Sequence, residues 1–95
     1  MDKVDIPQGT LELMILTILS RESLHGYGIS QKLAALTHDV FQVNPGSLFP
    51  SLYRLEQDDL VTRAWEIQEA GPARVVYTIT EAGIAYLQRF GMPKF

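Results

Sequence analysis

The segment from residue 43 to residue 60 reads VNPGSLFPSLYRLEQDDL and predicts the central helix of the molecule. Asn44 is a residue type that commonly caps a helix, and Pro45 suits the first helical position, so we expect a helix over residues 45–58. Three leucines spaced at i, i+4 and i+7 form one apolar stripe on this helix: Leu48, Leu52 and Leu55. This stripe should face a core.

The face opposite the leucine stripe has the composition of a surface that reads DNA. Small residues near the helix start allow a close backbone approach, and the Tyr and Arg that follow can bond to phosphates or base edges. The members of this face are Gly46, Ser47, Pro50, Tyr53, Arg54 and Gln57. Such a helix, preceded by a shorter one, is typical of major-groove readers. Taken alone, the pattern also fits an ordinary amphipathic helix with a solvated face.

Pro50 conflicts with a continuous helix. Proline removes a backbone donor and disfavours the α conformation at the residue before it. Propensity alone therefore favours a tight turn at 45–49 and a helix that begins at Pro50. The leucine stripe continues through the proline, however, and we predict one helix with an irregularity at this point.

Composition and charge restrict the class of protein. The 95 residues suffice for a single domain with one modest core, and the lack of cysteine excludes disulfides and thiolate metal sites. The longest nearly apolar run, residues 13–19, is too short to span a membrane, so we expect a soluble cytoplasmic protein. The net charge of −3 argues mildly against a nucleic-acid partner. The expected reading surface is nevertheless close to neutral or weakly basic, because Asp39 is the only acidic residue between Leu24 and Leu55.

Two further helices are expected ahead of the central one. Residues 10–21 carry one stripe of Leu11, Met14, Ile15 and Ile18, while Leu13 and Leu16 lie nearly opposite and could face a partner subunit. After a loose segment at 1–8 and a turn at 23–26, residues 27–36 form a short helix. Its expected inward residues are Ile29, Leu33 and Leu36, with Tyr27 and Gln31 outward.

The remaining residues predict a strand hairpin and a last helix. A brief strand is expected at 39–43, then strands at 60–67 and 74–79 joined through the Gly-Pro turn of residues 68–73. Thr80 should cap the final helix, with Ile84, Leu87 and Phe90 facing inward or towards a partner, and Gly91 and Pro93 should end it. The order of elements is that of a winged helix-turn-helix, mainly α with a small β-hairpin, in which residues 68–74 form the wing.

With these elements in place, the sequence resembles the PadR family of bacterial transcriptional regulators. The matching motifs lie at residues 9–11 (GTL), 25–29 (HGYGI), 44–56 (NPGSLFPSLYRLE), Tyr77 and 80–83 (TEAG). The match covers roughly residues 9–87. The family's motif for the third helix also contains the proline found here at position 50.

The resemblance implies a homodimeric winged-helix repressor of double-stranded operator DNA with inverted symmetry, in one domain over 1–95. Residues 9–79 would form its core and 80–91 a short helix that contacts the partner. In some members a small aromatic or hydrophobic effector relieves repression. Carried over residue by residue, it marks a DNA-binding set: Tyr27, Gly46, Ser47, Phe49, Pro50, Tyr53, Arg54 and Arg74. The dimer set, taken from apolar surface, is Leu13, Leu16, Ile84, Tyr86, Leu87 and Phe90.

Three features depart from the family pattern. Phe49 stands where tyrosine is common, so one hydroxyl contact to DNA is lost. The wing carries only Arg74 beside Glu66 and Glu69, where relatives often have several basic residues. The chain ends at Phe95, where relatives usually continue a long dimerising helix. These departures predict modest affinity for DNA.

Other readings of the chemistry-bearing residues carry less weight. His25 and His38 are too separated for a metal site, no cofactor motif occurs, and His25 fits a turn residue that packs against the fold. Trp65 fits a core or interface position better than a ligand platform. The acidic residues 56–59 fit a solvated helix end, so an enzyme is not expected. The main alternative is a winged-helix module that binds proteins and has lost its operator, which the sequence pI of about 5.2 favours.

Overall fold

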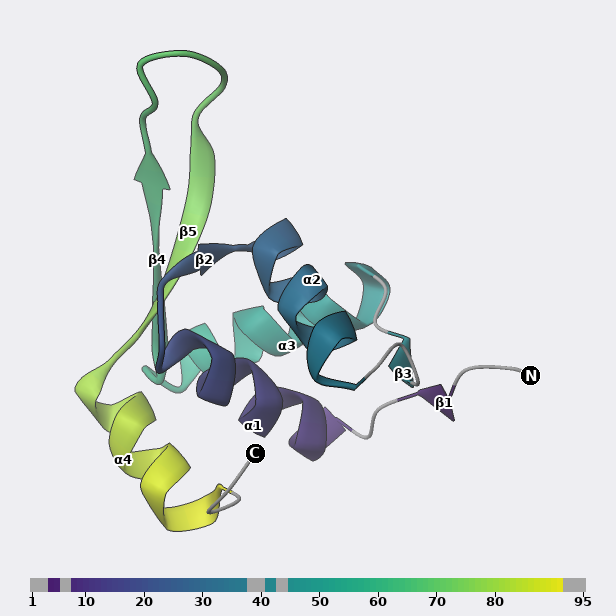
Figure 1. Cartoon of the computed structure of the whole chain (residues 1–95). Coiled ribbons are helices and arrows are strands. Elements are labelled where there is room, and N and C mark those ends of the chain that lie inside the picture. Colours follow the sequence, from purple (N-terminus) through teal and green to yellow (C-terminus); the bar gives the residue numbers. More distant parts are fainter. Residues whose placement is uncertain (1–3, 6–7, 38–40, 43–44, 92–95) are drawn as a thin grey trace.

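The structure is a computed structural model that describes residues 4–5, 8–37, 41–42 and 45–91. Four helices surround one core, and a long strand hairpin projects away from them (Figure 1). The helices are α1 (Gln8–Leu19), α2 (Gly26–Leu36), α3 (Pro45–Gln57) and α4 (Glu81–Phe90). The strands are β1 (Val4–Asp5), β2 (Leu24–His25), β3 (Phe41–Gln42), β4 (Val61–Glu66) and β5 (Arg74–Ile79).

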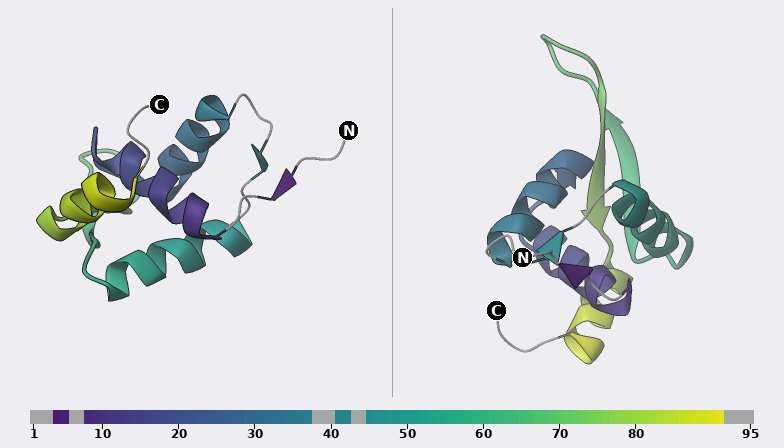
Figure 2. Two further views of the ribbon diagram at one scale, coloured as in Figure 1. Left: turned by 90° about the horizontal axis from the view of Figure 1, so that it is seen from below. Right: turned by 90° about the vertical axis from the view of Figure 1, so that its right-hand side faces the viewer.

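The core lies where α1, α2 and α3 meet the base of the hairpin. Two views turned by 90° show α1 between α4 and the pair α2 and α3, with the hairpin extending past all of them (Figure 2). The α3 stripe is buried as predicted, with Leu55 fully enclosed. The buried apolar residues are Leu11, Met14, Ile15, Leu16, Ile18, Leu19, Ile29, Leu33, Leu48, Leu52, Leu55, Leu60, Val61 and Tyr77.

Helix α3 runs through Pro50 without a break, as the leucine stripe predicted. Pro50 is the sixth residue of the helix, beyond the first four whose N–H groups have no partner in the helix. Because proline has no N–H, the helix loses one backbone hydrogen bond here, to the Gly46 carbonyl. The next residue, Ser51, is buried and donates its hydroxyl to the Ser47 carbonyl at 3.0 Å. The helix ends at Gln57, and Asp59, two residues later, has a left-handed φ of 59°. Leu60 N then donates to Leu55 O at 2.9 Å, a bond that satisfies a terminal carbonyl.

The hairpin is antiparallel and gains a third strand that the sequence did not predict. In β4 and β5, Val61 pairs with Ile79, and the register continues to Glu66 opposite Arg74. The expected turn at 23–26 instead contributes β2, in which His25 pairs with Val76 of β5. This pairing attaches the start of α2 to the wing.

Several other expectations need correction. Val4–Asp5 forms β1, which pairs in parallel with β3, so the segment at 1–8 is not simply loose. Leu36, expected to point inward, is 41% exposed at the last position of α2. Asn44 and Pro93, expected to cap and follow helices, lie outside the described residues. In the part of the chain that is described, no helix is long and apolar enough to cross a membrane.

Candidate nucleic-acid interface

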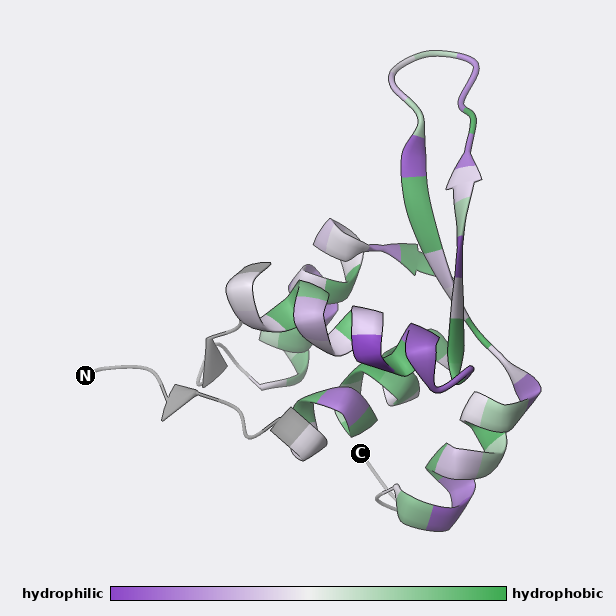
Figure 3. Cartoon of the chain, turned by 180° about the vertical axis from the view of Figure 1, so that it is seen from behind, coloured by the Kyte–Doolittle hydropathy of each residue, from purple (hydrophilic) through white to green (hydrophobic). Residues whose placement is uncertain are grey.

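The outer face of α3 is exposed in the manner expected of a surface that meets a partner. Gly46, Ser47, Pro50 and Tyr53 are all exposed, and the Tyr53 side chain is 60% exposed. The strongly hydrophilic end of α3 lies at the base of the hairpin (Figure 3). The structure therefore places the small and aromatic residues of this helix together on one accessible face.

Phe49 sits at one edge of this face and contacts the start of α2. It is 47% exposed, and a Cβ added at Gly26 would lie 2.9 Å from the Phe49 ring. Glycine at position 26 is therefore what allows the ring to cover the backbone of α2. The phenylalanine acts partly as a packing residue between α2 and α3, a role that the motif alone did not indicate.

Arg54 sits at the other edge of the face and is engaged by α1. Its Nε lies 3.3 Å from Glu12 Oε2, and the two side chains are 49% and 20% exposed. Burial raises the pKa of Glu12 above its ordinary value of 4.5, while Arg54 acts in the opposite direction and Asp58 adds to the rise. The guanidinium must therefore share or exchange this partner before it can bind a base or a phosphate.

Tyr27 is the second residue of α2 and is 69% exposed. Just before it, His25 accepts a hydrogen bond at Nδ1 from Gly28 N, over 3.1 Å, and so caps the helix. The two rings meet edge to face, with centroids 6.4 Å apart. Sequence reasoning treated His25 as a turn residue and missed this cap, because histidine is not among the usual capping residues.

The wing brings arginines and carboxylates together in pairs. Arg74 Nη2 lies 3.2 Å from Glu66 Oε1 across the two strands, and Arg63 Nε lies 3.3 Å from Glu56 Oε1 on α3. Tyr77 of β5 lies directly opposite Arg63 of β4. Burial raises the pKa of Tyr77 above its ordinary value of 10.0, although Arg63 acts to lower it. The positive charge near the candidate interface is therefore largely neutralised in the free protein.

The wing also exposes large apolar side chains. Trp65 is 72% exposed and Ile67 is 87% exposed. Of the two positions expected for Trp65, the core is therefore wrong, and an interface stays a prediction. The burial pattern of β4 gives the reason: Val61 is buried at the base of the strand, and every later residue of β4 is exposed as the hairpin projects away from the helices (Figure 1). Alternation along the strand did not reveal where the hairpin leaves the body of the protein.

The apolar residues expected at a dimer interface separate into two groups. Leu16 is fully buried inside the chain's own core, so it offers no surface to a partner and that prediction is wrong. Leu87 is partly buried against the same core, and Leu13 is half-buried. The remaining three line the exposed side of α4: Ile84, 40% exposed, Tyr86, 39%, and Phe90, 55%. The Tyr86 and Phe90 rings are in contact, with centroids 4.7 Å apart.

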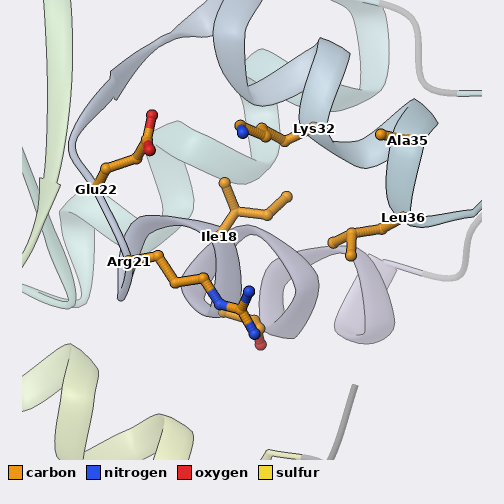
Figure 4. A pocket seen from close by; sticks show the side chains of 7 residues that line it. Ile18, Arg21, Glu22, Lys32, Ala35 and Leu36 are labelled. Atoms are coloured by element: carbon orange, nitrogen blue, oxygen red, sulfur yellow. The ribbon is translucent and has the colours of Figure 1, made fainter.

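A cavity of about 280 Å³ opens between α1 and α2, away from the wing (Figure 4). Its floor is aliphatic, with the Ile18 and Leu36 side chains pointing into it. Charged side chains stand around it, and in the described part of the chain neither Arg21 nor Lys32 forms an ion pair. The lining residues are Thr17, Ile18, Arg21, Glu22, Lys32, Ala35 and Leu36.

Comparison with known proteins identifies the fold and the family. Residues 15–89 match the family described as "Transcriptional regulator PadR-like family". The chain belongs to the PadR-like family of transcriptional regulators. It is similar to the transcriptional regulator YqjI of Escherichia coli, with 34% identity over 80 residues, which are 84% of this chain. The match covers 37% of the length of YqjI.

Two solved structures share this architecture. A PadR-like transcription factor from Bacteroides fragilis superposes with a TM-score of 0.76 at 34% identity, over 86% of this chain and 77% of that one. PadR of Bacillus subtilis, solved in complex with operator DNA, superposes with a TM-score of 0.75. The two proteins share 22% identity over 90% of this chain and 48% of that one. At this identity the superposition supports the fold alone. The winged helix-turn-helix predicted from the sequence is confirmed.

Proposed function

We propose that this PadR-like regulator is a cytoplasmic repressor that binds inverted-repeat operator DNA as a homodimer. Helix α3 enters the major groove and the wing, residues 68–74, contacts the backbone or minor groove. The observation that carries the proposal is the exposed outer face of α3, opposite a fully buried leucine stripe. The operator complex of the B. subtilis relative, which has the same fold, supports it.

The DNA contacts divide by chemistry into positioning and reading groups. Tyr27 at the start of α2 and Arg74 on the wing offer a hydroxyl and a guanidinium suited to phosphates. Along α3, the small residues Gly46 and Ser47 allow close approach, and Phe49, Pro50, Tyr53 and Arg54 follow beside them. Arg54 is the group suited to a bidentate base contact.

Ion pairing in the free protein limits the electrostatic gain on binding. Arg54 and Arg74 are each held by a carboxylate, and the chain has a net charge of −3. Each arginine that reaches a phosphate gives up its ion pair with a glutamate, which offsets part of the gain. Affinity should therefore be modest, and the number of phosphate contacts sets how steeply it falls with salt.

A small hydrophobic effector would fit the cavity between α1 and α2. The aliphatic floor offers an apolar body a place to pack, and Arg21 and Lys32 favour a ligand that carries an anionic group. Because α2 also carries Tyr27, a ligand at this helix could change DNA affinity. Filling the cavity by Ala35→Trp should abolish the response to aromatic and aliphatic carboxylates while DNA binding itself persists.

A second function, protein binding without an operator, is favoured by one observation on the wing. Trp65 and Ile67 are the most exposed large apolar side chains among the described residues, and apolar surface of this kind often marks a protein contact. Under this alternative the outer face of α3 would have no role in binding.

A salt-dependent mobility-shift assay with DNA from upstream of the protein's own gene separates the two functions. The proposed repressor should shift that DNA at low salt. The logarithm of the binding constant should fall linearly with the logarithm of the salt concentration. Trp65→Ser should affect this shift less than Tyr53→Ala. A failure to shift either this DNA or duplexes selected from a random pool would overturn the operator proposal.

A further inference from the structure

His25 joins the two parts of the proposed interface. It lies in β2, where it pairs with Val76 of the wing strand β5, and it is also the residue that caps α2. Its backbone is extended, with φ of −79° and ψ of 167°, which lets the side chain turn back over the helix start. A Cβ at Gly28 would lie 2.8 Å from His25 Nδ1, so glycine at that position is required for the ring to approach.

The cap needs a neutral imidazole. Nδ1 accepts a hydrogen bond from Gly28 N at 3.1 Å, and a histidine nitrogen can accept only when it carries no proton. A doubly protonated ring would instead point an N–H at the Gly28 N–H and would place a positive charge at the positive end of the helix dipole. Acidification should therefore open the start of α2.

Few titratable or charged groups lie against the His25 ring in the described ranges. Tyr27 on α2 is the one titratable residue in ring contact with His25 among the described residues. No carboxylate forms an ion pair with His25 in the described ranges, and its partner on β5 is the apolar Val76. On the α3 side, the residue packed against the start of α2 is the apolar Phe49.

We propose that neutral His25 is a positioning residue for DNA binding, because its Nδ1 holds the start of α2 and thereby fixes Tyr27 for phosphate contact. The inference rests on the proposed DNA-binding function. Its consequence runs against the usual effect of histidine at a DNA surface. A protonated histidine normally adds attraction to phosphate, whereas here protonation should weaken binding, since the cap is lost.

The first measurement is DNA affinity of the full chain from about pH 7.5 to about pH 5.5, the range in which histidine gains its charge. The probe is a duplex selected from a random-sequence pool. We expect binding to weaken roughly five- to tenfold on acidification, the range that loss of a helix cap produces. His25→Asn retains an oxygen acceptor that does not titrate, so it should bind at neutral pH as the unchanged protein does and show a flatter pH profile.

Two controls separate the cap from general effects. His25→Leu removes the acceptor and should bind weakly at every pH. Thr80→Ala removes the matching cap of α4, where Thr80 Oγ1 accepts from Gly83 N at 2.9 Å, and should lower stability without changing the pH profile. His38 is present in every variant, so the difference between the unchanged protein and His25→Asn isolates His25.

The second measurement needs no DNA. The protection of the Gly28 amide against hydrogen exchange should fall on acidification in the unchanged protein and should stay constant in His25→Asn. Tighter DNA binding at low pH, or equal pH profiles for the two proteins, would overturn the positioning role. If no DNA binds at any pH, the proposed function fails, and the Gly28 protection alone then decides whether His25 holds the start of α2.

Discussion

At the scale of single residues, Arg54 shows how an ion pair within the chain can occupy a side chain that is proposed to contact a DNA base. The guanidinium is half-exposed on the outer face of α3, yet its Nε lies 3.3 Å from Glu12. Arg54 is 49% exposed and Glu12 20% exposed, so the pair is only partly withdrawn from water and should contribute about 1 kcal/mol to folding. A substitution at either residue should therefore leave the fold intact and report on binding.

Arg54→Ala should weaken operator binding by about 1–3 kcal/mol if the residue makes a bidentate base contact. Glu12→Gln removes the competing partner and should leave binding equal or tighter. Titrations of the two single variants and the double variant form a cycle that separates the roles. Equal affinity for the unchanged protein and Arg54→Ala would show that the guanidinium serves only Glu12.

Gly83 is a residue whose identity is set by packing rather than by DNA. A Cβ at this position would collide with the Leu60 carbonyl oxygen, a backbone atom that cannot turn aside. Gly83→Ala should lower the free energy of unfolding by about 1–3 kcal/mol, as overpacking does. The matched control is Gly9→Ala in α1, which meets nothing within 4 Å and should be neutral or stabilising by up to about 1 kcal/mol. Urea denaturation of both variants tests this, and similar losses would remove the packing explanation.

At the scale of elements, the wing is a hairpin that leaves the body of the protein and carries no surplus of positive charge. Between residues 61 and 79 its two arginines, Arg63 and Arg74, match two glutamates, Glu66 and Glu69. Under the proposed function, the affinity of the wing for DNA therefore depends on whether Arg74 exchanges Glu66 for a phosphate. The apolar side chains beside it do not respond to salt, so salt dependence isolates this exchange.

Arg74→Gln should lower the slope of log K against log salt by about 0.9 for each phosphate contact that is lost in a subunit. Glu66→Gln should raise affinity, because it releases Arg74 and removes a negative charge from the wing. Shift assays at several salt concentrations measure both effects. Slopes that stay the same in both variants would place the wing away from DNA.

At the scale of the whole molecule, the exposed side of α4 is the surface best suited to a partner subunit. Ile84, Tyr86 and Phe90 remain partly exposed there, and inverted-repeat DNA requires two copies of α3. Leu13 is half-buried on α1, which packs against α4. Leu87 instead packs against the core, so it is a poor position for a test of association.

The double variant Tyr86→Ser and Phe90→Ser should shift the chain from dimer towards monomer while the helical content is kept. Sedimentation equilibrium over a series of protein concentrations measures the shift. Ile67→Ser, which removes a more exposed apolar residue from the hairpin, is the control and should leave the association unchanged. A dimer that survives the double variant would place the interface on another surface.

The order of the four helices and of the long strands β4 and β5, and the inward face of α3, could be predicted from the sequence because all depend on local periodicity. Leucines at i, i+4 and i+7 share one side of any helix, and this held through Pro50. The strand at 74–79 and the Thr80 cap followed from equally local signals. The exposed residues of α3 were separated from its core residues for the same reason.

Tertiary structure alone decided which of the remaining residues meet. Leu16 is enclosed although it lies off the main stripe of α1, because α1 is covered on more than one side, by α2, α3 and α4. Trp65 is exposed because the hairpin outruns the helices, and Arg54 is paired because α1 passes beside α3. His25 caps α2 because strand pairing with β5 fixes its backbone. Each of these contacts joins residues through the packing of separate elements, and the periodicity of one element carries no information about its neighbours.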